Sequence, residues 1–218
     1  MNRLAQHGLL TLCLMAVGIG HALAHSADEH VGHDMAAKSA SSERAQVKFA
    51  DVALVDQNGK TVRLEKDLVD NKIVVMSFIY TSCTTVCPVV SSIMGKVQKQ
   101  LGARVGTEVQ LVSISIDPQR DDAKRLNDYA RTFQKGPGWS WLTGSPQSVN
   151  DTLKGLGSFS GDFKNHQPLI LVGDGNSRHW TRYYGFTDPA VLSREVEKLS
   201  GERNAHAKHT AIAMEHQP

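Results

Sequence analysis

The run Ile73-Val74-Val75-Met76-Ser77-Phe78-Ile79-Tyr80 is almost continuously apolar, and Thr81-Ser82-Cys83-Thr84-Thr85-Val86-Cys87-Pro88 follows it directly. Such a run is typical of a central strand that is covered on both faces of a sheet. From about residue 84 to residue 100 the apolar positions recur at helical spacing. The order strand, cysteine turn, helix therefore predicts an α/β fold with reactive groups beyond the carboxyl end of a strand.

Cys83 and Cys87 are placed where thiols become reactive. The start of a helix carries partial positive charge and free N–H donors, so it stabilises a thiolate. The spacing of four residues puts both sulfur atoms on one helix face, with Cβ atoms roughly 6 Å apart. Two thiolates at that separation can share a soft metal ion, or they can close a disulfide. From these residues alone, the function could be copper-type metal binding, dithiol redox chemistry, or both.

The rest of the chain alternates strands with helices. Residues 47–65 are predicted to form a β-hairpin around Asn58-Gly59. Further strands are expected at residues 109–116, 139–142, 168–172 and 178–184, and further helices at residues 121–133, 145–156 and 188–199. This order predicts a three-layer α/β fold with an N-terminal β-hairpin.

The first residues read as a secretory signal. Arg3 supplies a positive charge, an apolar core follows, and Ala22-Leu23-Ala24 is a small-residue cleavage site. We expect residues 1–24 to be the signal peptide and cleavage after Ala24 to release the protein into the periplasm. An uncleaved signal would instead anchor the chain in the membrane. Cys13 leaves with the signal, so the mature protein keeps only Cys83 and Cys87.

Composition divides and limits the mature chain. Residues 25–44 and 202–218 are polar and contain histidine, so both are expected to be flexible tails around a domain of residues 45–201. The net charge is +2 and the basic residues do not cluster, which argues against nucleic-acid binding. No apolar run is long enough to span a bilayer, so no transmembrane segment is expected after signal cleavage.

Three motifs together resemble the Sco/SenC family over roughly residues 47–200. They are Thr81-x-Cys83-x-x-x-Cys87-Pro88 after a strand, residues 117–122 after the next strand, and Asn165-His166 before a late strand. The resemblance implies a thioredoxin-like fold and delivery of copper to cytochrome c oxidase, with thiol reduction there as a related task. It also implies copper ligands at Cys83, Cys87 and His166. The implied partners are a copper-accepting oxidase subunit or another copper chaperone, and a thiol–disulfide partner.

Ligand chemistry agrees with copper, Cu(I) or Cu(II), as the metal. Thiolates select Cu(I), and imidazole accepts either oxidation state. Structural zinc usually takes four protein ligands, whereas only three are indicated here. We therefore expect a metallochaperone rather than an enzyme.

Three other functions compete with this interpretation. A thiol–disulfide oxidoreductase would use Cys83 as the attacking thiol and Cys87 as the resolving thiol, although two intervening residues are the usual redox spacing. A peroxidase would need an arginine beside Cys83, which the local motif lacks. A copper-buffering module would work through tail residues: His25, His30, His33, Met35, His206, His209, Met214 and His216.

Two aspartates near the predicted site have alternative roles. Asp117 ends a strand at the same edge as Cys83, so it could bond the cysteine turn and tune a thiol pKa, or it could start a turn with Pro118. For Asp121 we favour the role of N-cap of the next helix.

Overall fold

The computed structural model describes residues 41–134, 136–159, 161 and 166–215, with side chains to residue 210. These residues all belong to one compact unit, residues 36–218. The predicted signal peptide, its cleavage site and residues 25–40 of the predicted tail lie outside the described residues. Within the described part, no helix is long and apolar enough to cross a membrane.

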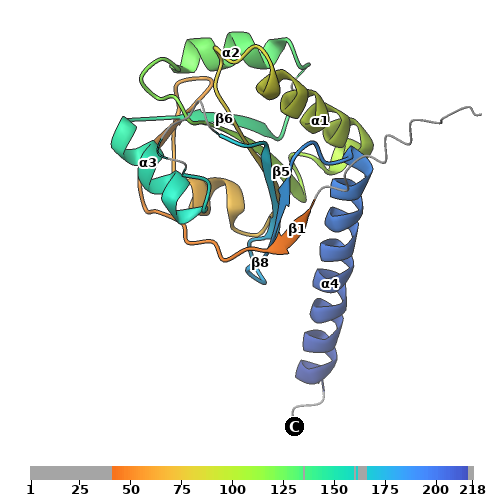
Figure 1. Ribbon diagram of the computed structural model, residues 1–218. Coiled ribbons are helices and arrows are strands. Elements are labelled where there is room, and N and C mark those ends of the chain that lie inside the picture. Colours follow the sequence, from red (N-terminus) through yellow and green to blue (C-terminus); the bar gives the residue numbers. More distant parts are fainter. Residues whose placement is uncertain (1–40, 135, 160, 162–165, 216–218) are drawn as a thin grey trace, which may run out of the picture. The chain divides into compact units, whose positions relative to one another are not determined.

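The described residues form one eight-stranded sheet in the order β1-β8-β7-β4-β5-β6-β2-β3. Figure 1 labels β1, β8, β5 and β6 of this sheet. The bounds of its strands are β1 Ser42–Arg44, β2 Leu54–Asp56, β3 Thr61–Val62, β4 Ile73–Ile79, β5 Val109–Ser115, β6 Trp139–Thr143, β7 Leu169–Asp174 and β8 His179–Tyr184. Strands β4, β5 and β6 run parallel, while β7 is antiparallel to β4. All of β4 is buried between two neighbours, so the predicted central strand is confirmed.

Helices cover both faces of this sheet. Their bounds are α1 Val86–Leu101, α2 Ala123–Arg131, α3 Pro146–Gly155 and α4 Pro189–Glu215, with shorter turns η1 Leu64–Val69 and η2 Gly102–Arg104. One core contains Val75 and Ile79 of β4 together with residues of α1, α2 and α4. The other contains Val74 and Met76 of β4 together with residues of α3 and η1. This alternation along β4 confirms the predicted three-layer α/β fold.

Hydrogen bonds join polar side chains in the middle of the apolar sheet. Ser77 of β4 and Ser113 of β5 are paired neighbours, and their hydroxyl oxygens lie 2.9 Å apart. The Trp139 indole N–H donates to the Ser113 hydroxyl at 3.0 Å. Both serines are fully buried, so these bonds satisfy polar groups that would otherwise destabilise the core.

The predicted hairpin is confirmed in shorter form, and Ser145 caps the start of α3. Strands β2 and β3 pair around a turn in which Gly59 has a φ of 81°, a conformation that favours glycine. Leu64, which we expected in the second strand, begins η1 instead. At α3 the Ser145 side chain accepts the Ser148 N–H at 3.0 Å, and Pro146 is in the first turn.

Both predicted tails are shorter than the sequence indicates. Ser42–Arg44 form strand β1, which pairs antiparallel with β8, and the adjacent Ala45 is buried. At the other end α4 continues from the expected stop near residue 199 to Glu215. Arg203 holds this extension by pairing with the buried Asp174 carboxylate and donating to the Asn71 carbonyl at 3.1 Å. The structure thus contains a strand at residues 42–44 and a helix at residues 202–215, where we expected no regular structure, while the flexibility of the tails stays a prediction.

Candidate dithiol and metal site

The two cysteines lie in and just after the turn that joins β4 to α1. The Cys83 N–H donates to the Tyr80 carbonyl at 3.2 Å, and Cys87 is the second residue of α1. The Cys87 N–H donates to the Cys83 sulfur at 3.3 Å. Thr85 at the N-cap makes no capping bond through its side chain, so the Cys83 sulfur satisfies one of the free N–H groups of the helix. Both thiols are free and buried.

The environment of Cys83 favours its thiolate. Burial alone would raise the pKa, but hydrogen bonds outweigh it and lower the Cys83 pKa to about 7. They come from the backbone and the thiol of Cys87, from the Thr85 backbone and from the Tyr80 hydroxyl. This is the effect expected where a thiolate meets a helix N-terminus. A large fraction of Cys83 is therefore ionised at neutral pH.

Cys87 behaves in the opposite way. Burial raises its pKa to about 12, and its hydrogen bond to Cys83 and the nearby charges of Cys83 and Asp121 act in the same direction. The Tyr80 pKa also rises to about 12, chiefly because its hydroxyl bonds to Cys83. At neutral pH the pair thus consists of one thiolate and one thiol. We did not predict the role of Tyr80, although its hydroxyl at the end of the apolar run was a usable signal.

Asp121 does not cap the following helix, contrary to our expectation. Asp122 does so, since its carboxylate accepts the Arg125 N–H at 2.7 Å. The buried Asp121 carboxylate instead accepts the Thr81 N–H at 3.1 Å and the Thr81 hydroxyl. It also accepts the Ser115 hydroxyl at 2.6 Å. Asp121 therefore ties the cysteine turn to the end of β5.

Asp117 follows the turn-forming alternative. The Asp121 N–H donates to its carbonyl at 2.9 Å, which closes a turn after β5. Its buried carboxylate accepts the Arg120 guanidinium at 3.1 Å. Its own N–H donates to the Ser115 hydroxyl at 3.1 Å. Asp117 still acts on the site through its charge, which contributes to the raised pKa of Tyr80.

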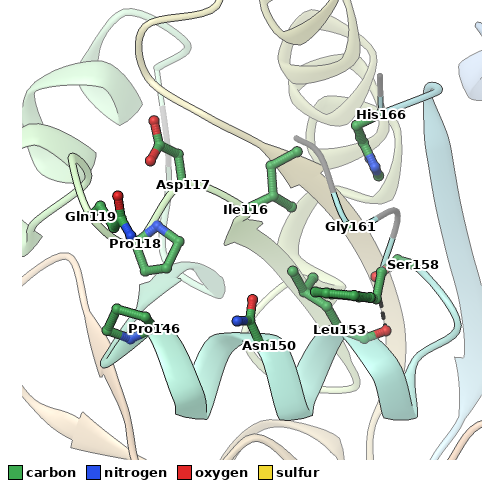
Figure 2. Close-up of a pocket in the computed structure, with 11 residues that line it drawn as sticks. Ile116, Asp117, Pro118, Gln119, Pro146, Asn150, Leu153, Ser158, Gly161 and His166 are labelled. Carbon is green, nitrogen blue, oxygen red and sulfur yellow. Dashed lines mark hydrogen bonds between the residues drawn. The ribbon is translucent and has the colours of Figure 1, made fainter. Parts of the chain in front are cut away.

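His166 lies before β7, at the edge of the sheet where β4 ends. Its ring packs edge-on against Phe78, with centroids 6.0 Å apart. Burial lowers the His166 pKa, so the ring is neutral at physiological pH. Its Nε2 atom is buried and has no hydrogen-bond partner among the described residues. His166 lines a cavity of about 200 Å³, together with Asp117, Gln119 and Asn150. Figure 2 shows His166 at one end of this group of residues.

Comparison with known proteins decides the family. Residues 40–200 match SCO1/SenC. The chain belongs to the SCO1/SenC family. A SCO1 protein homolog of Bacillus subtilis is 35% identical over 94 residues, which are 43% of this chain and 47% of that protein. The chain thus matches about half the length of this SCO1/SenC relative.

Solved structures of SCO1/SenC proteins share the fold. Bradyrhizobium japonicum ScoI with copper bound has a TM-score of 0.59 at 24% identity, covering 69% of this chain and 98% of ScoI. BsSco, described with a disulfide switch and as a member of the Sco family of cytochrome c oxidase assembly proteins, has a TM-score of 0.61 at 24% identity. That match covers 73% of this chain and 96% of BsSco. The predicted thioredoxin-like α/β fold is confirmed.

The structure gathers only part of the ligand set implied by the resemblance to Sco/SenC. Cys83 and Cys87 are in hydrogen-bond contact. Across the described residues, however, no group of three or more His, Cys, Asp or Glu side chains could hold a metal ion. His166 therefore does not join the two cysteines in a metal-binding group in this conformation.

The tail histidines fall into two groups. His206 and His209 lie exposed on the extension of α4, where the Thr210 hydroxyl and the His206 Nδ1 atom are 3.3 Å apart. His25, His30, His33 and His216 lie outside the described residues, as does Met35. Copper buffering by these residues stays a prediction.

Proposed function

We propose that this SCO1/SenC protein binds copper through Cys83 and Cys87, with His166 as the third ligand. Its task would be to deliver copper to the copper centre of a respiratory oxidase, or to keep the thiols of that centre reduced. The observation that carries the proposal is the cysteine pair at the start of α1, where the Cys87 N–H donates to the Cys83 sulfur. The predicted signal peptide would place this activity in the periplasm.

The donor set fits copper. Thiolates are the ligands that select Cu(I), and the Cys83 pKa of about 7 provides one thiolate near neutral pH. Cys87 would lose its proton on binding, because a metal-bound thiol is deprotonated. Copper would supply the charge that offsets this ionisation inside a buried site.

The chemistry of His166 suits a third copper ligand, although in this structure it does not lie with the two cysteines. A metal-ligating imidazole must be neutral, and burial lowers the His166 pKa. Its Nε2 atom also has no competing partner in the described part of the chain. Binding of copper by all three residues would require His166 and the cysteine turn to approach one another.

The client is proposed from the relatives. Bradyrhizobium japonicum ScoI was solved with copper bound, and BsSco is described as belonging to cytochrome c oxidase assembly proteins. A copper-accepting oxidase subunit is accordingly the partner we propose. Another copper chaperone could supply the metal.

Metal analysis of the reduced mature protein tests the site. We expect one tightly bound Cu(I) per chain, and loss of that copper in the double variant Cys83→Ser, Cys87→Ser. The same analysis of a chain that ends at Thr210 tests whether residues 211–218 contribute to the copper binding. Tight binding that survives the double substitution would show that copper is held elsewhere.

A second candidate function is thiol–disulfide exchange, favoured by the difference between the two thiols. Cys83, with a pKa of about 7, would attack a partner disulfide, and Cys87 would resolve the mixed disulfide. Measuring copper affinity and exchange rate on the same His166→Ala variant separates the two functions. If exchange collapses while copper affinity is unchanged, His166 serves proton transfer and the oxidoreductase function should be preferred.

A further inference from the structure

A buried carboxylate beneath the cysteine turn has donors on two separate segments. Asp121 accepts the Thr81 N–H and hydroxyl from the β4–α1 turn and the Ser115 hydroxyl from the end of β5. Its own carbonyl accepts the Thr143 hydroxyl at 2.7 Å from the end of β6. The ends of three parallel strands are thus joined through a residue that is 2% exposed.

We propose that Asp121 is a positioning residue for the dithiol site, holding the turn that carries Cys83 at the end of the sheet. This inference rests on the proposed function, because it concerns the same cysteine pair. Asp121 acts through Thr81 and touches neither sulfur in the described contacts.

The chemistry of the three donors explains why a carboxylate stands here. The Thr81 N–H can only donate, while the two hydroxyls can donate or accept. A carboxylate accepts all three, and charged acceptors form stronger hydrogen bonds than neutral ones. An asparagine of the same shape could keep the Thr81 N–H bond through its oxygen, with the hydroxyls turned to accept from its amide. Alanine would leave all three donors without this partner.

Holding Thr81 controls the cysteines through the next two residues. Thr81 lies two positions before Cys83, whose N–H bonds back to Tyr80. If the turn loosened, the Cys83 sulfur would no longer be held beside Cys87, and disulfide closure would become less favourable. Loss of the anchor should therefore shift the pair toward the dithiol.

The test measures the dithiol–disulfide equilibrium of the full mature protein without copper. Reaction with glutathione disulfide forms the Cys83–Cys87 bond and releases two glutathione thiols, so the ratio of the two protein forms gives the equilibrium constant. We expect Asp121→Ala to shift this constant toward the dithiol about tenfold, which corresponds to about 30 mV. Asp121→Asn should give a smaller shift in the same direction. Thr81→Val, which removes only the hydroxyl, should shift the constant by a fewfold.

Asp122→Asn is the matched control. It removes a carboxylate one position away but keeps a good helix N-cap, so we expect the equilibrium constant to stay within twofold of the parent. If Asp121→Ala does not fold, the Asp121→Asn and Thr81→Val variants decide the question.

Either of two results would overturn the inference. One is an unchanged constant in every folded variant of Asp121 and Thr81, with only the melting temperature lowered. The other is an equal shift in Asp122→Asn. Because no copper is present, failure of the proposed copper site would leave this result unaffected.

Discussion

The cysteine turn and the His166 segment lie at the same edge of the sheet, yet they are held very differently. Cys83 accepts the Cys87 N–H, and the turn before it is fixed to Asp121. His166 packs against Phe78 beside a cavity, and its Nε2 atom has no partner among the described residues. The dithiol is therefore already organised in this structure, whereas His166 would have to move toward it to complete the proposed copper site.

Oxidation of the cysteine pair should have the largest effect on copper binding. Closing the Cys83–Cys87 disulfide should weaken Cu(I) binding by about a thousandfold or more, because metal ligation requires thiolates. Copper retention by oxidised and reduced protein, compared by equilibrium dialysis, measures this. The Cys83→Ser variant is the control, since it cannot form the disulfide and should respond little to oxidant. Equal retention by both forms of the parent protein would place the copper elsewhere.

The second prediction concerns the inequality of the two thiols. Cys83 should be alkylated by iodoacetamide about a hundredfold faster than Cys87 at neutral pH, after allowing for the greater nucleophilicity of the more basic thiol. The Cys83 rate should rise with pH and reach half its maximum near its pKa of about 7. Mass spectrometry of the modified peptides measures the alkylation rate of each cysteine. The pH should be varied over about two units on either side of the Cys83 pKa. Similar rates at the two cysteines would contradict the asymmetry.

The third prediction tests whether His166 contributes to copper binding. His166→Ala should weaken copper binding about tenfold, with Cu(II) affected more than Cu(I), because imidazole is the harder donor of the proposed set. His179→Ala, on β8 and outside both the proposed site and the tails, is the matched control and should leave affinity unchanged. Competition titrations with a copper chelator measure both oxidation states. An unchanged affinity in His166→Ala would confine the site to the two thiols.

The smallest effect is expected from the extension of α4, which should change the stability of the fold and not the cysteine pair. Ending the chain at Gly201 removes the Arg203 contacts with Asp174 and Asn71, so the free energy of unfolding should fall by about 1–2 kcal/mol. Ending it at Thr210 keeps Arg203 and should leave stability nearly unchanged. Urea unfolding measures both, and the Cys83 alkylation rate should be the same in each. A changed alkylation rate would mean that the extension of α4 acts on the dithiol.

Regular patterns made much of the fold predictable from sequence. The apolar run of β4, the helical spacing of α1 and the Asn58-Gly59 turn each indicated an element that the structure contains. Strand β1 was missed because its three residues, Ser42–Arg44, are exposed and lack an apolar pattern. The extension of α4 was missed because it has little apolar periodicity, although alanine and lysine favour helices there.

The candidate site was predictable only where its residues are neighbours in sequence. The four-residue spacing was enough to bring Cys83 and Cys87 together. Asp121 acts through contacts that depend on the packing of β4 beside β5, so local patterns gave Asp121 the role that Asp122 performs. For His166, family resemblance indicated a role that the described conformation does not display.

The bonded serines in the sheet have a consequence for the cysteines. Ser77 can reach Ser113 only when β4 and β5 are aligned as they are here. A slip of one residue would move β4 by about 3.3 Å and turn its side chains to the opposite face. Thr81 would then lose its place opposite Asp121, and Cys83 would move with it. The hydrogen bond between these two hydroxyls thus helps to fix the register of β4 and β5, and with it the position of Cys83 beyond the end of β4.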